Sequence, residues 1–490
     1  MIITETHLSV ANGKDPASIS GLTKDQARAY KGLMEFINSP YNENDYKRAV
    51  IGAAGVGKTY LLKAIIKNCD YTYSQIGLSA PSHKACRVLR DNLIGLPCKV
   101  NTVQSDFGLR LNFNVEDFDI NKPPFDPRGS IKIDKFSLYI IDEASMINKG
   151  LLQFIEKYTK EYKVKIIYVG DDHQLAPVGE NTSEAFKYVK SYKLKQIVRQ
   201  EEDNPIRPLL DMLRKDIDNR TYEFLNFIIK HPEGFDKDFT KGYKVLNTQD
   251  FDNEVYKQFN DEAITRNTDF VRIIAYTNKA VGAWNKIVRN SIIKDANKSP
   301  ITKNDLITSY VTIVDEYNDI IIRNSEDYII HDIVNYVHPK YNIKGFMIKF
   351  QAIHGGQITS PLFVVDHNDA FSMNLYCKLT EEYIRAAKTA NRFARANKWK
   401  DYYKFKESCL LLINIGDKEG NILYTRDLDY GFAQTAHKSQ GSTYDTVMVD
   451  INDIVYDKYG NAYVDAREVN KRLYVAISRC KNKCYLRYGV

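Results

Sequence analysis

The sequence lacks the features that mark several special classes of protein. None of its 490 residues falls in an unbroken apolar run long enough to span a bilayer, so we expect no membrane association. The first ten residues, MIITETHLSV, carry no basic n-region before an apolar stretch, so we expect no secretory signal. Internal repeats and low-complexity linkers are also missing. These absences favour a cytoplasmic protein. A chain of 490 residues is too long for one hydrophobic core, so we expect two or more globular domains.

Cysteine is scarce and its spacing suggests no metal site. The chain has seven cysteines, and the only close pair, Cys480 and Cys484, has no further Cys or His nearby. We therefore expect free thiols in a reducing compartment. The formal net charge of +7 is small for this length, so it permits a polyanionic partner without requiring one.

Positive charge is concentrated in two stretches that also contain aromatic residues. One stretch covers residues 385–406 and the other covers residues 479–490. Either stretch could contact phosphates while its aromatic rings stack on bases. A solvated amphipathic helix for the first stretch and a closing strand for the second fit the sequence at least as well.

A glycine-rich motif is the strongest chemical signal in the chain. Gly52, Gly57, Lys58 and Thr59 make G-x-x-x-x-G-K-T between an apolar strand-like run and a segment with helical apolar spacing. Such glycines let backbone N–H groups turn towards phosphates, while Lys58 reaches the β- and γ-phosphates and Thr59 offers a hydroxyl to Mg²⁺. The motif predicts binding of a nucleoside triphosphate, but it does not say what hydrolysis drives.

Two further apolar runs end in polar residues. The run before Asp142 and Glu143 predicts a strand beside the strand of the glycine-rich loop. Asp142 would then hold the water shell of Mg²⁺, and Glu143 would act as general base towards the attacking water. A third strand, within 163–170, leads to Gln174, whose amide could contact the γ-phosphate. We expect these strands to be parallel, with the site at their carboxyl ends.

The order of these motifs resembles that of superfamily 1 helicases, and within them the RecD-like branch. The matching segments are LTKDQARAY (22–30), GAAGVGKT (52–59), LSAPSHKACRVL (78–89), NTVQSDFGL (101–109), IIDEASM (140–146), VGDDHQLAPVGE (169–180), LKQIVRQ (194–200), VRIIAYTNKAVGAWNKIVR (271–289), GFAQTAHKSQGSTYDTVMVD (431–450) and RLYVAISRCKNKCYL (472–486). The resemblance implies an α/β protein with two RecA-like parallel-sheet motor domains of the P-loop NTPase type. It also implies an ATP-dependent helicase, with ATP and Mg²⁺ as cofactors, that moves 5′→3′ on single-stranded DNA in replication or recombination.

The resemblance also divides the chain into domains. We expect a flexible tail at 1–20, a first motor core at 21–104 and 136–200, a β-hairpin pin at 105–135, a second motor core at 201–299 and 426–490, and an SH3-like β-barrel with a basic helix (381–406) at 300–425. In the hairpin, LRLNFNV would be the first strand and SIKI (130–133) would be the returning strand. Phe125, between prolines at the tip, would be the wedge that splits a duplex, although a plain surface hairpin fits equally well.

The site residues follow from the same resemblance. Gln26 would read the adenine edge and Tyr276 would stack on it. Arg199 and Arg479 would be arginine fingers that stabilise charge in the transition state, in a role suited to a permanently charged, bidentate group. The expected nucleotide contacts are Gln26, Gly52, Gly55, Gly57, Lys58, Thr59, Tyr60, Tyr276 and Gly441. The expected DNA contacts are Ser82, His83, Thr102, Ser105, His173, Thr435, His437, Lys438 and Gln440.

The expected partners are single-stranded DNA and junctions of single strand with duplex, together with a single-strand-binding or replication protein, and the chain is expected to be a monomer. Two other classes of function stay open at this point. A P-loop kinase or metabolic NTPase would leave Arg479 and the second core unused, and ATPase activity independent of any polynucleotide would favour it. An inactive motor that only holds DNA would conflict with the intact Lys58 and Glu143. RNA also remains open as the track, because phosphate contacts say little about the 2′-hydroxyl.

Overall fold

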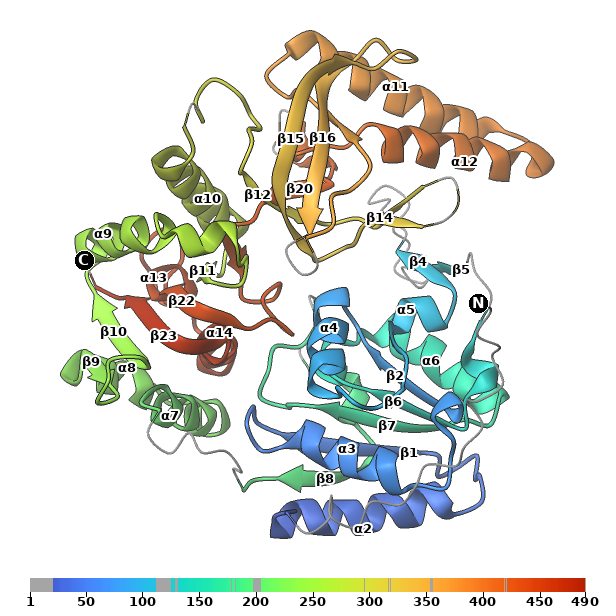
Figure 1. Cartoon of the computed structure of the whole chain (residues 1–490), viewed down its shortest axis with the longest axis vertical. Helices are drawn as coiled ribbons and strands as arrows, with labels where there is room; N and C mark the ends of the chain where they lie inside the picture. The colour runs from blue at the N-terminus through green and yellow to red at the C-terminus, as the bar shows by residue number, and fades with distance from the viewer. Residues whose placement is uncertain are drawn as a thin grey trace, which may run out of the picture. The chain divides into compact units, whose positions relative to one another are not determined.

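The computed structural model describes residues 21–489, with gaps at 112–124, 128–130, 178, 181, 197–203, 295, 316, 318, 353–355, 418 and 420. The described chain forms two compact units (Figure 1). Unit 1 comprises the residues up to Leu246 together with Thr435–Gly489, and unit 2 comprises Asn247–Gln434. The chain therefore leaves unit 1 once, builds the whole of unit 2, and returns.

Unit 1 contains a six-stranded parallel sheet with the order β3-β2-β6-β7-β1-β8 (Figure 1). Its strands are β1 (Lys47–Gly52), β2 (Ile76–Ala80), β3 (Val100–Thr102), β6 (Leu138–Ile141), β7 (Lys165–Gly170) and β8 (Lys190–Leu194). The three strands predicted around the nucleotide motifs, β1, β6 and β7, are confirmed. The expected neighbour of β1 is wrong, because β7 lies between β1 and β6. Buried parallel strands read alike as apolar runs, so their order is not encoded in any one of them.

Helices cover both faces of this sheet. They are α2 (Lys24–Asn38), α3 (Lys58–Asn68), α4 (His83–Asn92), α5 (Val103–Asp106) and α6 (Lys149–Glu161). Val50 of β1 packs in one core with residues of α2, α3 and α4, including Leu33 and Leu62. Its neighbour Ile51 packs in a second core that includes Ile155 of α6. Side chains of a strand alternate between the two faces, so each face has its own hydrophobic core and the sheet is doubly wound.

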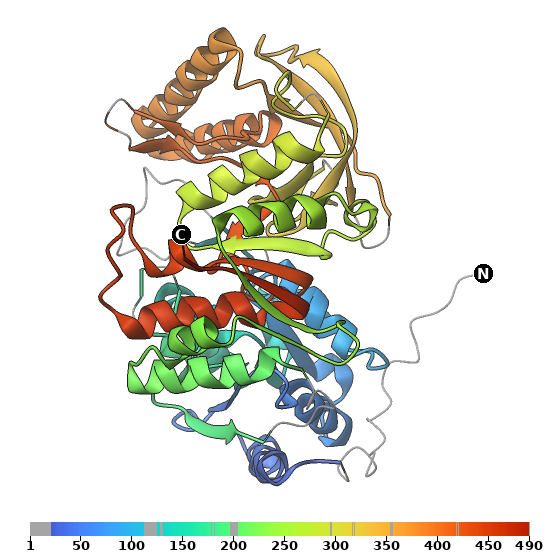
Figure 2. The ribbon, with the colours of Figure 1, turned by 90° about the vertical axis from the view of Figure 1, so that its left-hand side faces the viewer.

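The rest of unit 1 forms a second group of strands in the order β22-β23-β10-β9. Its elements are α7 (Ile206–Asn219), α8 (Glu223–Lys230), β9 (Glu233–Phe235), β10 (Gly242–Leu246), β22 (Tyr444–Asp450), α13 (Ile451–Val455), α14 (Ala466–Ser478) and β23 (Cys480–Arg487). Helices α7 and α14 lie side by side (Figure 2). Most of the basic C-terminal stretch is the strand β23, as the closing-strand interpretation predicts. Its Lys481 ammonium lies 3.2 Å from the carboxylate of Asp445.

Unit 2 combines further α/β elements with an antiparallel sheet. Its elements are α9 (Thr248–Phe259), β11 (Val271–Ala275), α10 (Asn278–Ile292), β12 (Leu306–Ser309), β13 (Ile313–Val314), β14 (Ile320–Ile322), β15 (Asp327–Val337), β16 (Lys344–Ala352), β17 (Leu362–Val365), α11 (Ala370–Thr389), α12 (Arg392–Ser408), β18 (Ile415–Gly416), β19 (Ile422–Tyr424), β20 (Leu428–Tyr430) and β21 (Ala433–Thr435). Five of its strands pair antiparallel in the order β17-β16-β15-β12-β20. The β-rich character of this insertion is confirmed, whereas closure into an SH3-like barrel stays a prediction.

The single basic helix predicted at 381–406 is wrong, because the segment is the end of α11 followed by α12 (Figure 1). Asn391 begins the second helix, since its side-chain oxygen accepts a hydrogen bond from the N–H of Ala394 at 3.0 Å. An asparagine N-cap of this kind stabilises a new helix start by about 1 kcal/mol. The basic composition that runs through the break hid this signal.

The predicted hairpin exists, but its returning strand differs. Strand β4 (Leu109–Leu111) pairs antiparallel with β5 (Phe125–Pro127), and Leu111 lies opposite Phe125. Of the predicted returning segment SIKI, the described residues 131–133 are not a strand, because Ile133 is buried in the core and begins a short 3-10 helix. Phe125 therefore starts a strand, and the turn of the hairpin lies outside the described residues.

All seven cysteines are free, and Cys69, Cys86, Cys409 and Cys484 are buried. Burial raises the pKa of the Cys86 and Cys409 thiols to about 12. In the described part of the chain, no helix has both the length and the hydrophobicity to cross a bilayer.

Candidate nucleotide site

The glycine-rich loop connects the end of β1 to the start of α3. Gly55 and Gly57 have positive φ angles of 82° and 75°, a region that side-chain-bearing residues rarely adopt. At Gly52 the constraint is space, because an added Cβ would lie 2.7 Å from a methyl group of Val56. The Lys58 ammonium donates to the carbonyl oxygens of Gly52 at 2.7 Å and of Ala53 at 2.9 Å. The loop thus has the tight form and the central cation that phosphate binding requires.

Gln26 supports the same loop from α2. Its buried side-chain N–H₂ donates to the carbonyls of Val56 at 2.9 Å and Gly57 at 3.3 Å. Its side-chain oxygen accepts from the N–H of Thr23 at 2.9 Å, which completes a capping box. The amide nitrogen of Gln26 therefore braces the loop and its oxygen caps α2, and the predicted reading of adenine by Gln26 stays a prediction.

Asp142 and Glu143 follow β6 at the carboxyl edge of the sheet. The carboxylate of Asp142 accepts a hydrogen bond from the N–H of Glu143 at 2.9 Å, and Glu143 has a left-handed backbone with φ of 50°. Burial and the neighbouring Glu143 raise the pKa of Asp142 to about 6, although the charge of Lys58 opposes this shift. A half-buried carboxyl group that resists ionisation beside a second carboxylate fits a divalent cation, and Thr59 lies in the first turn of α3.

Asp171 at the end of β7 connects the first sheet to the helices of the second group. Its almost fully buried carboxylate accepts from the Arg214 guanidinium at 3.2 Å and from the Tyr474 hydroxyl at 2.5 Å. Burial opposes the negative charge, but the hydrogen bond from His173 and the charges of Arg214 and Lys58 hold the pKa of Asp171 well below its usual range. Arg214 belongs to α7 and Tyr474 to α14, so one carboxylate connects three elements.

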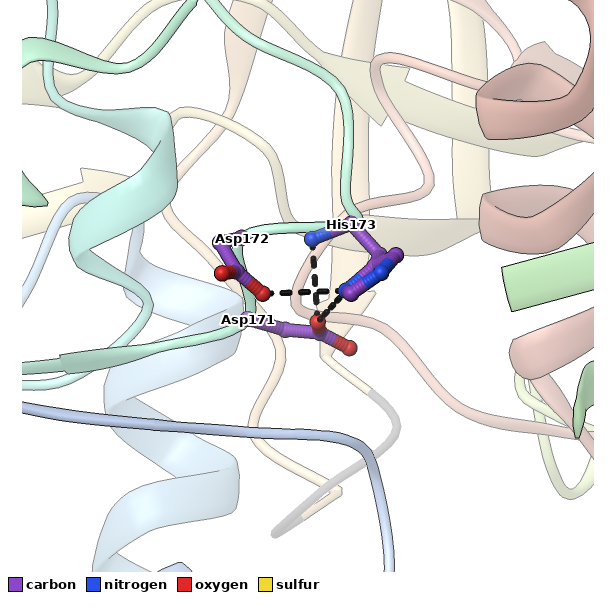
Figure 3. A group of neighbouring side chains, drawn as sticks. All are labelled: Asp171, Asp172 and His173. Atoms are coloured by element: carbon purple, nitrogen blue, oxygen red, sulfur yellow. Dashed lines mark hydrogen bonds and ion pairs between the residues drawn. The ribbon is translucent and has the colours of Figure 1, made fainter. Parts of the chain in front are cut away.

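His173 lies in an acidic cluster (Figure 3). One ring nitrogen is 2.9 Å from Asp172 and the other is 3.0 Å from Asp218 of α7. Burial disfavours a charged ring, but hydrogen bonds to Asp171 and Asp172 raise the pKa of His173 to about 9. The distances among Asp171, Asp172 and His173 would suit a metal ion. Since the imidazolium and Arg214 already neutralise these carboxylates, we assign no metal to them. The DNA contact of His173 stays a prediction.

The segment before β22 contacts the first sheet. Gln440 is buried, and its side-chain N–H₂ donates to the carbonyl of Leu175 at 3.0 Å and approaches the side-chain oxygen of Gln174 at 3.4 Å. Gly441 has a φ of 72°, and a Cβ there would lie 3.0 Å from the Cβ of Ala85 in α4. The structure therefore places Gln440 next to the predicted phosphate sensor Gln174 and away from solvent, and it places Gly441 against α4.

Arg479 lies at the end of α14, the helix that carries Tyr474. Its guanidinium donates to the hydroxyl of Ser478 at 2.8 Å and to the carbonyl of Val475 at 3.1 Å. Arg479 is buried in this arrangement. The second predicted finger, Arg199, lies outside the described residues, and Tyr276 follows β11 in unit 2.

Several predicted DNA contacts are helix caps or loop residues at the carboxyl ends of strands. The hydroxyl of Ser82 accepts from the N–H of Ala85 at 3.2 Å, and that of Thr102 accepts from the N–H of Ser105 at 3.2 Å. Thr435 accepts in the same way from the N–H of Lys438. The exposed residues of this set are Ser105 and Lys438, whereas His83 and His437 are partly buried. Phosphate contact by these residues stays a prediction. The predicted nucleotide contact Tyr60 is 41% exposed on α3.

Three residues of this region were not predicted from the sequence. Arg214 and Asp218 lie in α7, for which the sequence offered no motif. Tyr474 lies within a quoted motif, and its polar ring in an otherwise apolar helix segment was a usable signal.

The geometry defines a P-loop NTPase whose nucleotide sheet is bonded to a second group of strands and helices. Residues 22–227 match the family described as an AAA domain. The chain is 26% identical over 302 residues to the ATP-dependent DNA helicase Dda of Enterobacteria phage T4, an alignment that covers 60% of this chain and 61% of that protein. It is 25% identical over 516 residues to an uncharacterized protein of Acanthamoeba polyphaga mimivirus, covering 94% of this chain and 98% of that protein.

Among solved structures, the Pif1 helicase of Candida albicans is 16% identical with a TM-score of 0.48, covering 96% of this chain and 94% of that one. A Bacteroides Pif1 helicase in complex with ADP-AlF₃ and single-stranded DNA is 16% identical with a TM-score of 0.47, covering 95% of this chain and 92% of that one. The family match covers the segment that carries the glycine-rich loop, Asp142 and Asp171.

Proposed function

We propose that this protein is an ATP-dependent DNA helicase that translocates 5′→3′ on single-stranded DNA and separates duplex strands. One observation carries the proposal. The strand β7, which lies between the P-loop strand and the strand of Asp142, ends in a carboxylate that is bonded to Arg214 and Tyr474. A purely metabolic NTPase has no need for such a connection, whereas a motor must transmit changes at the phosphates beyond the sheet that binds them.

The residues of the site divide the chemistry of hydrolysis among them. Lys58 neutralises charge on the β- and γ-phosphates of ATP, and Glu143 accepts the proton of the attacking water. Thr59 and Asp142 would hold Mg²⁺, which supplies charge neutralisation at the phosphates when it is bound. Gln174 contacts the γ-phosphate or the water, and Arg479 and Arg199 stabilise charge that develops in the transition state.

The DNA track and the polarity rest on the relatives and on the motif resemblance. The phage T4 relative is named an ATP-dependent DNA helicase, and the Bacteroides Pif1 structure contains single-stranded DNA. Ser105 is exposed in the short helix α5 that follows β3, and Lys438 is exposed in the segment that follows β21, where backbone phosphates would pass. The 5′→3′ direction comes from the RecD-like motifs.

Strand displacement from two duplexes, one with a 5′ tail and one with a 3′ tail, tests the proposal. With ATP and Mg²⁺ we expect displacement of the 5′-tailed duplex only. Lys58→Ala should abolish it by loss of phosphate neutralisation, whereas Lys63→Ala, on the same helix, should not. Displacement from the 3′ tail alone would refute the polarity, and ATP consumption without displacement of either duplex would refute the helicase assignment and direct attention to RNA.

A further inference from the structure

The outer face of α12 carries a row of side chains that the proposed motor does not use. We define this face as Phe393, Asn397, Lys400 and Lys404, whose spacing of four, three and four residues places them along one side of a helix. All four are exposed, and the ring of Phe393 is 92% exposed.

The opposite side of α12 explains why this face points outward. Tyr402 and Phe405 are buried in a core that includes Tyr376 and Ile384 of α11. These contacts fix the rotation of α12 about its axis, because the buried side of an amphipathic helix determines which residues face solvent. The row from Phe393 to Lys404 is therefore a fixed feature of the surface.

The lysines of α12 differ in the contacts that they make. Lys406 lies 3.6 Å from Asp427 and donates to the hydroxyl of Tyr376 at 2.6 Å, and Lys398 lies 3.9 Å from Asp401. Among the described residues, no carboxylate lies within ion-pair distance of Lys400 or Lys404. These two lysines are four residues apart, a spacing at which like charges destabilise a helix.

The outer face thus combines two features that do not stabilise the fold. An exposed phenylalanine ring gains little from burial, and two neighbouring lysines repel each other. Both features become favourable beside a polyanion with accessible aromatic faces. Proteins that bind single strands without sequence preference combine cations along the backbone with aromatic rings on which bases stack.

We propose that the outer face of α12 is an additional binding surface for single-stranded DNA, a proposal that rests on the DNA track of the proposed function. Lys400 and Lys404 pair with backbone phosphates, and the ring of Phe393 stacks on an unpaired base. A duplex is a poorer partner, because its bases are stacked inside and offer no face to the ring.

Fluorescence anisotropy with a labelled oligothymidylate tests this surface over a range of salt concentrations. The logarithm of affinity falls with the logarithm of salt, by about 0.7 for each single-strand phosphate contact. We expect Lys400→Ala/Lys404→Ala to reduce the magnitude of that slope by about 1.4. Phe393→Ala should lower affinity about tenfold without changing the slope, because it removes stacking and no charge.

Two control variants test whether the change in salt slope is specific to the positive charges on α12. Lys230→Ala/Lys237→Ala removes two exposed lysines from unit 1, and Lys400→Arg/Lys404→Arg keeps both charges on α12; both should retain the original slope. An unchanged slope for the double alanine variant would overturn the proposal, as would a larger loss of affinity for a blunt duplex of equal length. Unchanged affinity for Phe393→Ala would overturn the stacking contact.

The outcome can be separated from failure of the proposed function. Strand displacement by the unmodified chain tests the helicase, and the salt slopes test α12. Displacement with unchanged slopes refutes only the additional surface, whereas absence of displacement refutes the helicase whatever the slopes are.

Discussion

At the scale of single residues, the pKa values of two aspartates that follow neighbouring strands are shifted in opposite directions. Burial and Glu143 raise the pKa of Asp142 to about 6. Burial disfavours the charge of Asp171 as well, but there the hydrogen bond from His173 and the charge of Arg214 lower the pKa. Groups whose environments push their pKa values apart commonly have different tasks. Here Asp142 makes no ion pair within the described part of the chain, whereas Asp171 is bonded to Arg214 and Tyr474 and holds structure.

The assignment of Glu143 as general base predicts the behaviour of Glu143→Gln. We expect ATP binding to be retained and the catalytic rate to fall about 10²–10⁴-fold, because the amide cannot accept the proton of water. Single-turnover hydrolysis and nucleotide titration measure the two effects separately. Glu161→Gln, at the exposed end of α6, is the matched control and should hydrolyse ATP normally, and normal turnover by Glu143→Gln would contradict the assignment.

The bond between Asp171 and Arg214 predicts a coupled effect on stability. Arg214→Met leaves a buried carboxylate without its cation, so we expect the free energy of unfolding to fall by about 3–5 kcal/mol. In the double variant Asp171→Asn/Arg214→Met the stranded charge is gone, so much of that loss should be recovered. Urea denaturation of the four proteins of this cycle gives the coupling energy. Strictly additive losses would show that the two side chains act independently.

At the scale of elements, the segment between β21 and β22 approaches α4 closely. Gly441 is adjacent to Ala85, and the ammonium of Lys84 donates to the hydroxyl of Tyr444 at 2.9 Å while lying 4.6 Å from the centre of its ring. Lys84 is itself buried, so this contact holds a charge away from water. The first turn of α4 and the end of this segment are therefore packed as one piece.

Gly441→Ala tests this packing. The positive φ and the 3.0 Å approach to Ala85 both oppose a side chain. We expect a loss of about 1–3 kcal/mol in the free energy of unfolding, because the strained backbone and the overpacking add. Gly282→Ala is the control with the opposite sign. Gly282 lies inside α10 with no neighbour within 4 Å of its added Cβ, so alanine there should stabilise the helix by about 0.5–1 kcal/mol. Thermal unfolding measures the stability of both variants. Equal effects of the two substitutions would contradict the packing argument.

At the scale of the whole molecule, the raised pKa of Asp142 makes the free energy of unfolding depend on pH. A carboxyl group whose pKa is higher in the folded state stabilises the fold when protonated, and that contribution is lost as the pH rises through the folded value. For Asp142 this window runs from about its ordinary value of 3.8 up to about 6. Above this pH range the charged Asp142 lowers the free energy of unfolding of the whole protein, because unfolding relieves the unfavourable burial of the charge.

Asp142→Asn should therefore be more stable than the unmodified protein above about pH 6, by about 1–3 kcal/mol in the absence of divalent cations. The difference should vanish near pH 4, where Asp142 is protonated. Asn keeps the oxygen that accepts from the Glu143 N–H, so the local geometry is retained. Denaturation at several pH values measures the effect, and exposed Asp134→Asn should show none. A variant less stable at pH 8 would show that the burial of Asp142 is not the dominant cost.

The sequence predicted local elements of the fold better than their arrangement. The strand, loop and helix around Lys58 were predictable, because local glycines and apolar periodicity specify them. The order of β6, β7 and β1 was not, since it depends on packing between segments that read alike. Arg214 and Tyr474 were missed as partners of Asp171, because more than forty residues separate the nearer of them from it along the chain. The break at Asn391 was predictable from its capping preference and was obscured by the basic run around it.

The burial of the thiols has a practical consequence. Burial raises the pKa of the thiols of Cys69, Cys86, Cys98, Cys377, Cys409 and Cys484, so these groups react slowly with maleimide dyes at neutral pH. A cysteine placed at an exposed site, with Cys480 changed to serine, would be labelled selectively in an otherwise unaltered chain. Two such labels, one in each compact unit, would make a distance reporter with which nucleotide-driven motion of single molecules can be followed.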